Sequence, residues 1–313
     1  MNRSRWSLSP ARYRAVCVFA LALECIIVVS GALVRLTGSG LGCDDWPNCN
    51  DTKFIDVSSK HAAIEQINRL FTGLVSVSVI LAVLGALWRT PRRKDLTWLA
   101  VGLVGGVLGQ IVLGGSTVLV DLHPVAVQSH FLLSMVLVAN SIVLLYRAGQ
   151  PDGPRRTQVS APIRRDVWVL ASLSLVAIGF GTVVTGSGPH AGDEDARRFD
   201  LAIVTAARMH SVAVWIAVAA SAWLLWRLMR SPADRRVLET PAVAWVCVAI
   251  AQGLIGYIQY FSGVPVVLAA LHIAGATALW SITVWLVVLL RTSAPEPSVG
   301  EPLEERDELV DHV

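Results

Sequence analysis

The sequence predicts an all-α membrane protein with eight transmembrane helices, arranged as two related four-helix halves. Of its 313 residues, 54% are hydrophobic and 16% are charged, whereas an ordinary soluble domain has roughly 25% charged residues. The apolar residues form runs of about 20 residues or more, which is enough to cross a hydrocarbon layer of roughly 30 Å. A repeated segment, described below, indicates the two halves. The chain is therefore expected to cross a membrane many times.

The expected spans follow one another with short polar connections. They cover residues 15–36, 64–88, 96–116, 125–147, 166–186, 203–229, 240–260 and 265–290. The first span lacks a small-residue cleavage site and is followed by further spans, so we interpret it as a retained helix and not as a signal peptide. The acidic, proline-containing segment 293–313 is expected to be a disordered cytoplasmic tail.

The positions of Lys and Arg predict the orientation, because loops that keep positive charge tend to stay in the cytoplasm. Clusters of these residues precede the first span and follow the second, fourth and sixth spans. Both termini are then cytoplasmic, and the protein is expected to be a multi-pass protein of the cell membrane. The formal net charge of +3 reflects this topology and does not indicate a nucleic-acid partner.

An internal repeat supports the division into halves, expected at 1–150 and 151–292. Gly31-Ala-Leu-Val-Arg-Leu-Thr-Gly-Ser-Gly40 ends the first span, and Gly179-Phe-Gly-Thr-Val-Val-Thr-Gly-Ser-Gly188 ends the fifth. Both halves begin on the cytoplasmic side, so the repeat is parallel and its pseudo-twofold axis should run along the membrane normal.

After the outer loops the repeat settles at an offset of about 142 residues. It pairs Asn68 with His210 and His130 with His272, and it also pairs Gln110 with Gln252. The first four residues lie on even-numbered spans, at a common depth on the order of 10 Å from the outer end at 1.5 Å per residue. Within each half, two such side chains are expected to face each other.

Histidines at this depth indicate haem. Ionisable residues inside a membrane are costly and are usually functional, although a histidine that is hydrogen-bonded between helices is the alternative. A porphyrin iron takes axial imidazoles from opposite sides, and helix bundles commonly house such sites. His210 and His272 are therefore bis-histidine candidates in the second half, and Arg69 or Arg208 could pair with haem propionates.

The two halves differ at the positions that matter most. The first half has Glu65 where the second has Ala207, and Asn68 where the second has His210. A carboxylate one turn from a ligand position, in a half with one fewer histidine, indicates an acid or base beside an open iron face. We interpret the first half as a substrate site; the alternative is that Glu65 only faces the lipid headgroups.

Two cysteines and two further histidines belong to the outer side. Cys43 and Cys49 flank a short loop on the oxidising side, which favours a disulfide over free thiols or a metal site. His61 and His123 each precede a ligand position by seven residues, so they could relay protons or ligate, or simply be solvated. Glu24 in the first span has no evident partner.

The chain resembles the bacterial form of haem A synthase, a membrane enzyme of cytochrome oxidase assembly, over nearly its whole length. The resemblance rests on Gly31 to Cys49, on Ile64-Glu-Gln-Ile-Asn-Arg69, on Gly114-Gly-Ser-Thr-Val-Leu119 with His130, and on the His210 and His272 helices. It implies an oxidoreductase that converts haem O to haem A by oxidising a porphyrin methyl group to a formyl group.

The resemblance also implies roles for individual residues. His210 and His272 would ligate haem b as the cofactor, and His130, with Asn68 and Arg69 nearby, would receive haem O. Glu65 would be the catalytic carboxylate. Haem O synthase (protohaem farnesyltransferase) is implied as a partner by the pathway, and a homo-oligomer remains open.

Two departures and two alternative functions accompany this interpretation. Many family members have histidine at the position of Asn68, so the substrate iron here is expected to be five-coordinate, to bind through water or to be reached by His61. Some members also have a second cysteine pair, which residues 187 to 202 lack. The alternatives are a membrane cytochrome b that only carries electrons, which Asn68 argues against, and a transporter, for which broken helices at mid-membrane would be expected.

Overall fold

The computed structural model describes residues 7–293, and within them it has eight helices that are long and apolar enough to cross a membrane. This confirms the predicted fold class. The helices are α1 (Pro10–Leu36), α2 (Lys60–Trp88), α3 (Lys94–Leu119), α4 (Pro124–Ala148), α5 (Ala161–Ser187), α6 (Ile203–Met229), α7 (Pro232–Phe261) and α8 (Val266–Val288). The predicted tail beyond residue 293 lies outside the described residues.

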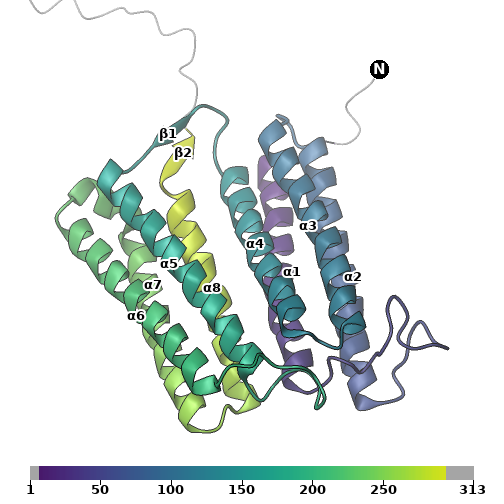
Figure 1. Cartoon of the computed structure of the whole chain (residues 1–313). Coiled ribbons are helices and arrows are strands. Elements are labelled where there is room, and N and C mark those ends of the chain that lie inside the picture. The colour runs from purple at the N-terminus through teal and green to yellow at the C-terminus, as the bar shows by residue number, and fades with distance from the viewer. Residues whose placement is uncertain (1–6, 294–313) are drawn as a thin grey trace, which may run out of the picture.

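The helices form two rings of four (Figure 1). Helices α1 to α4 contact one another in sequence and α4 closes the first ring on α1, while α5 to α8 form the second ring in the same way. The rings meet where α8 contacts α1 and α4, and where α4 contacts α5.

Several helices begin earlier than predicted, among them α1, α2, α5 and α7. The start of α5 is at Ala161 instead of 166, and α7 starts at Pro232 instead of 240. The extra turn of α7 is too polar to appear as part of a span, but Asp234 anchors it by accepting hydrogen bonds from the backbone nitrogen and hydroxyl of Ser160, each at 2.8 Å. Hydrophobicity therefore locates the membrane-crossing part, while a polar contact with the residue before α5 holds the polar start of α7.

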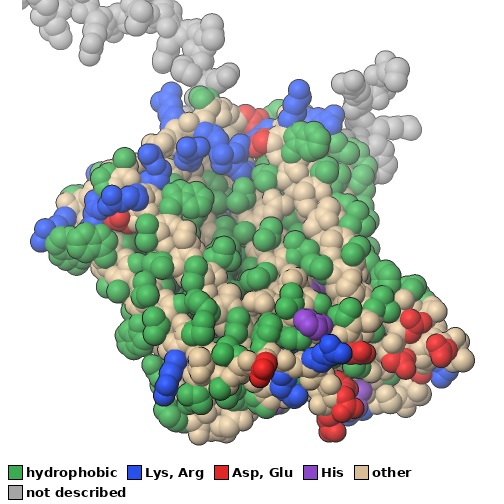
Figure 2. Space-filling view, viewed as in Figure 1, with side chains coloured by type: hydrophobic (Ala, Val, Ile, Leu, Met, Phe, Trp, Pro, Cys, Tyr) green, Lys and Arg blue, Asp and Glu red, His purple; other side chains and the backbone are tan. Residues whose placement is uncertain are grey.

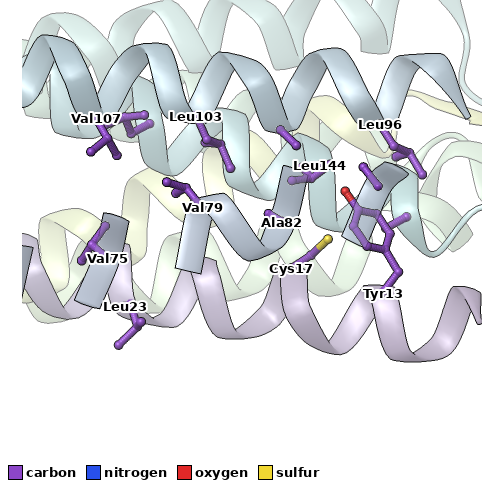
Figure 3. Close-up of a cluster of buried hydrophobic side chains, with 14 residues drawn as sticks. Tyr13, Cys17, Leu23, Val75, Val79, Ala82, Leu96, Leu103, Val107 and Leu144 are labelled. Carbon is purple, nitrogen blue, oxygen red and sulfur yellow. The ribbon is translucent and has the colours of Figure 1, made fainter. Parts of the chain in front are cut away.

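Each ring encloses a packed apolar core. In the first ring, Tyr13, Leu96 and Leu103 are completely buried among α1, α2 and α3 (Figure 3). In the second ring, Trp245 is 2% exposed and donates its indole N–H to Thr283 Oγ1 at 2.9 Å. Lipid tails are as apolar as these side chains, so close packing and interhelical hydrogen bonds hold the helices together.

The two ends of the molecule differ in charge. Lys and Arg side chains gather at the end of the molecule where α4 is joined to α5 and where α8 ends (Figure 2). There β1 (Arg155–Thr157) pairs antiparallel with β2 (Arg291–Ser293). The same basic end carries an ion-pair network in which Asp95 accepts from Arg93 at 2.8 Å and from Arg147 at 2.5 Å. The predicted site residues lie toward the opposite end, which the sequence predicts to be the outer one.

Candidate functional site

The paired histidines of the second half face each other. His210 lies on α6 and His272 on α8, and their ring centres are 6.3 Å apart with an angle of 80° between the ring planes. His210 Nδ1 is 2.9 Å from the carbonyl oxygen of Ala177 on α5. A carbonyl can only accept a hydrogen bond, so Nδ1 carries the proton and Nε2 is left as the basic nitrogen.

The spacing of these rings fits a haem iron between them. With metal–nitrogen bonds of about 2 Å and a ring centre about 1 Å behind the nitrogen, two imidazoles on one metal have centres about 6 Å apart. Within residues 7–293, no three His, Cys, Asp or Glu side chains converge as a metal site. Two histidines suit a porphyrin iron, because the porphyrin supplies the other four ligands.

Both histidine rings lie against glycines on the preceding helix. A β-carbon added to Gly256 on α7 would be 3.2 Å from Cε1 of His272, and one added to Gly181 on α5 would be 3.3 Å from Cε1 of His210. Any larger residue at these positions would press on the ring. The absence of a side chain therefore creates the space that each imidazole occupies.

The first half repeats this arrangement with one substitution. A β-carbon on Gly114 of α3 would be 3.1 Å from Cε1 of His130, and one on Gly31 of α1 would be 3.9 Å from Nδ2 of Asn68. Asn68 Oδ1 accepts a hydrogen bond of 2.9 Å from the hydroxyl of Ser30. The first half thus has the same glycine-backed positions, with an amide in place of one imidazole.

Behind His130 lies a glutamine of the repeat. Gln110 on α3 donates from Nε2 to the carbonyl oxygen of His130 at 3.2 Å and to Ser134 Oγ at 2.7 Å. Nδ1 of His130 is buried without a hydrogen-bond partner, as is Nδ1 of His272. The backbone of α4 is therefore fixed at the histidine, while the ring itself makes no hydrogen bond through Nδ1.

Glu65 is a buried carboxylate with three hydrogen bonds. It is 6% exposed, and its Oε1 accepts two hydrogen bonds from Arg69, at 3.0 Å and 2.7 Å. Its Oε2 accepts from the backbone nitrogen of Cys43 at 2.8 Å. These three bonds fill three of about four acceptor positions of a carboxylate, so both oxygens of Glu65 are held by the protein.

Arg69 extends this network into the outer loop. Beyond Glu65, it donates to the carbonyl oxygens of Asn48 at 2.9 Å and Asp45 at 3.1 Å. Four of its interactions are therefore within the protein, which leaves few donors for a haem propionate. Arg208, the other cation suggested for that role, is exposed on α6.

The outer loop is closed by the predicted disulfide. Cys43 and Cys49 are bonded, which confirms the prediction. Within the loop, Trp46 packs so closely on α3 that a β-carbon on Gly115 would lie 2.6 Å from its indole ring. The loop thus covers the outer end of the first half, from α2 to α3.

The remaining outer histidines are engaged elsewhere. His61 Nδ1 is 2.9 Å from Ser39 Oγ, and His123 Nδ1 accepts a hydrogen bond of 3.4 Å from the backbone nitrogen of Val125 at the start of α4. Neither belongs to the facing positions of Asn68 and His130.

Comparison with known proteins assigns the chain to a family. A family model described as "Cytochrome oxidase assembly protein" matches residues 14–284, which is most of the chain. The chain belongs to this family.

Relatives of the cytochrome oxidase assembly protein include several haem A synthases. That of Listeria welshimeri serovar 6b is 24% identical over 289 residues, which cover 88% of this chain and 94% of the relative. That of Listeria monocytogenes serotype 4a has the same identity and coverage. That of Bacillus cereus is 23% identical over 281 residues, covering 84% of this chain and 88% of the relative.

Sequence reasoning missed two features of the site in this cytochrome oxidase assembly protein. The first is the set of backing glycines, of which Gly114 and Gly256 are separated by the same offset of 142 residues as His130 and His272. This equal spacing could have predicted the two glycines from the sequence. The second is the hydroxyl of Ser30, whose contact with the amide depends on how α1 and α2 pack and left no mark in the sequence.

Proposed function

We infer that this protein is a haem A synthase, which oxidises the methyl group of haem O to a formyl group and so supplies haem A for cytochrome oxidase. The observation that carries the proposal is the pair of repeat-related sites, one with two facing histidines and the other with one histidine, an amide and a buried carboxylate. Family membership and relatives named haem A synthase support the same function. The bound haem supplies the iron that the oxidation requires.

The second half is the cofactor site in this proposal. His210 and His272 hold haem b between α6 and α8, supported by the ring-centre separation of 6.3 Å. The hydrogen bond from His210 Nδ1 to Ala177 orients the ring and makes Nε2 more basic, as such bonds do for other metal-bound histidines.

The first half receives haem O with His130 as the iron ligand. Glu65 acts there as the proton acceptor, because it is a buried carboxylate three residues from Asn68 whose orientation is fixed by Arg69 and by the backbone of Cys43. Arg69 is a positioning residue first and contributes to substrate binding through its remaining donor. The disulfide loop keeps bulk water away from this outer end.

The cellular setting follows from charge and pathway. The basic end described above lies in the cytoplasm, so both termini are cytoplasmic and both haem sites lie toward the outer face of the cell membrane. The substrate must come from an enzyme that makes haem O, so haem O synthase is the proposed partner.

The test is to extract and mass-analyse haems from the purified protein expressed in cells that also make haem O. Wild type should yield haem b with haem A or a hydroxylated intermediate. Glu65→Ala should hold haem b and unconverted haem O. Glu65→Gln is the matched control, because it keeps the size of the side chain but cannot take up a proton as a carboxylate does.

The same experiment separates the main alternative. Facing histidines at this spacing are equally expected in a membrane cytochrome b that only carries electrons. If wild type and both variants contain haem b alone, the enzyme proposal is wrong and the electron carrier takes its place.

A further inference from the structure

We propose that the first half presents an open axial position on its haem iron, faced by the amide N–H group of Asn68, which binds a small exogenous ligand able to accept a hydrogen bond. Dioxygen and carbon monoxide are ligands of this class. The inference rests on the proposed function in that it requires a haem on His130. The inference goes beyond the proposed function because it states what lies on the face of the haem iron opposite His130 and which kind of ligand binds there.

The first step is that Asn68 stands where the second half has a ligand. Asn68 and His210 are 142 residues apart, the same offset as His130 and His272. Each half also backs these positions with glycines, as described above for Gly31 and Gly114. His210 and His272 face each other at 6.3 Å between ring centres, and the repeat therefore assigns Asn68 to the position opposite His130.

The second step is that Asn68 does not fill the axial position itself. Its Oδ1 is occupied by the hydroxyl of Ser30 at 2.9 Å. A neutral amide oxygen is also a poor ligand for haem iron, which is served by imidazole, thiolate or thioether groups. The asparagine side chain is shorter than histidine, so it leaves room on that face.

The third step is that no neighbouring side chain takes its place. His61 lies seven residues before Asn68, which is about 10 Å away along the helix, and its Nδ1 is bound to Ser39. His123 caps α4. Glu65 is held by Arg69 and by the backbone of Cys43.

The fourth step concerns the free end of the amide. Within residues 7–293, Asn68 Nδ2 makes no hydrogen bond, although the side chain is half-buried and its other end is fixed by Ser30. Nδ2 lies beside Gly31 of α1, where even an added β-carbon would be 3.9 Å away, so no side chain at that position covers its two N–H donors. A ligand on the iron whose outer atom accepts a hydrogen bond would satisfy one of them.

The test uses the full-length protein, purified with its haems, reduced and titrated with carbon monoxide. Haem is extracted and counted in the same sample. We expect one carbon monoxide per protein that holds two haems, because the bis-histidine site of the second half has no open position. Asn68→His should abolish binding at unchanged haem content, since it restores the second imidazole.

Two further variants examine the amide itself. Asn68→Leu should still bind carbon monoxide, about 2- to 10-fold more weakly, with a raised C–O stretching frequency because the hydrogen bond is lost. Ser30→Ala should shift the same frequency by releasing Oδ1. Ser116→Ala is the matched control: its hydroxyl bonds only the carbonyl of Val112 on the exposed side of α3, so it should behave as wild type.

The failures are distinguishable. A protein with two haems that binds no carbon monoxide overturns this inference and leaves the proposed function standing. Equal binding by wild type and Asn68→His also overturns it. A protein that holds haem b alone, even when haem O is supplied, removes the proposed function and this inference together. An unchanged stretching frequency in both Asn68→Leu and Ser30→Ala refutes the role of the amide.

Discussion

Replacing Gly256 with alanine should weaken haem binding in the second half by pushing on His272. The new β-carbon would lie 3.2 Å from Cε1 and 3.7 Å from Nδ1 of the imidazole. Unstrained carbon contacts are about 3.5–4.0 Å, so the ring must move by roughly 0.3–0.8 Å. Functional sites tolerate about 0.5 Å of such displacement. Overpacking of this kind costs about 1–3 kcal/mol. If this cost weakens the bond between His272 and the haem iron, haem binds about 5- to 150-fold more weakly.

A matched control lies one turn earlier on the same helix. A β-carbon on Gly253 would have no neighbouring atom within 4 Å. Gly253→Ala should therefore keep the haem and gain helix propensity, by roughly 0.8–1 kcal/mol in a soluble helix. Both variants are compared by haem content, by the visible spectrum of the reduced protein and by the rate of haem transfer to a haem-scavenging protein.

The outcome decides between two explanations of the glycine. If Gly256→Ala keeps its haem at the wild-type rate with an unchanged spectrum, the glycine does not position the imidazole and the reasoning is refuted. If both variants lose haem equally, general helix packing and not the histidine contact is responsible.

Three further predictions concern the stability of the folded protein, each measured by thermal unfolding in detergent. Arg69→Ala should lower the free energy of unfolding by about 3 kcal/mol, the low end for a broken buried ion pair, because the arginine side chain is 21% exposed. Arg69→Lys should recover part of this loss, and an unchanged unfolding midpoint in Arg69→Ala would contradict the ion pair with Glu65. Replacing Cys43 and Cys49 together by serine should cost about 2 kcal/mol for a separation of 6 residues, and reductant should then have no further effect. Leu103→Ala, fully buried, should cost about 2 kcal/mol through lost packing, whereas Leu108→Ala, 59% exposed, should cost little; equal losses would refute the assigned core.

The helices were predictable because each membrane crossing requires a long apolar run, which is visible directly in the sequence. Their polar ends were not, since the first turn of α7 depends on Asp234 reaching Ser160 across the bundle. The disulfide could be predicted from two cysteines six residues apart on the oxidising side.

The candidate site was predictable to a different degree. The repeat offset paired His210 with Asn68 and His272 with His130, because equal spacing in sequence maps to equal positions in repeated bundles, and the structure shows His210 and His272 facing each other. It could not reveal the hydrogen bond from Ser30 to Asn68, or the network that binds Glu65 to the disulfide loop, since these depend on interhelical packing and loop conformation. The sequence therefore indicated which residues meet, and the packing showed what holds them.

The position of α8 has a consequence for how the protein is made. Helix α8 leaves the ribosome after the seven other described helices, yet it contacts α1, α4, α5 and α7, and Trp280 on it donates a hydrogen bond of 2.8 Å to the carbonyl oxygen of Met135 on α4. The first ring closes on itself without α8, so it can assemble while the second half is still being synthesised. Union of the two halves must wait until α8 has been synthesised, and a nascent chain stalled before Val266 would hold a finished first ring beside three helices that have no closing partner.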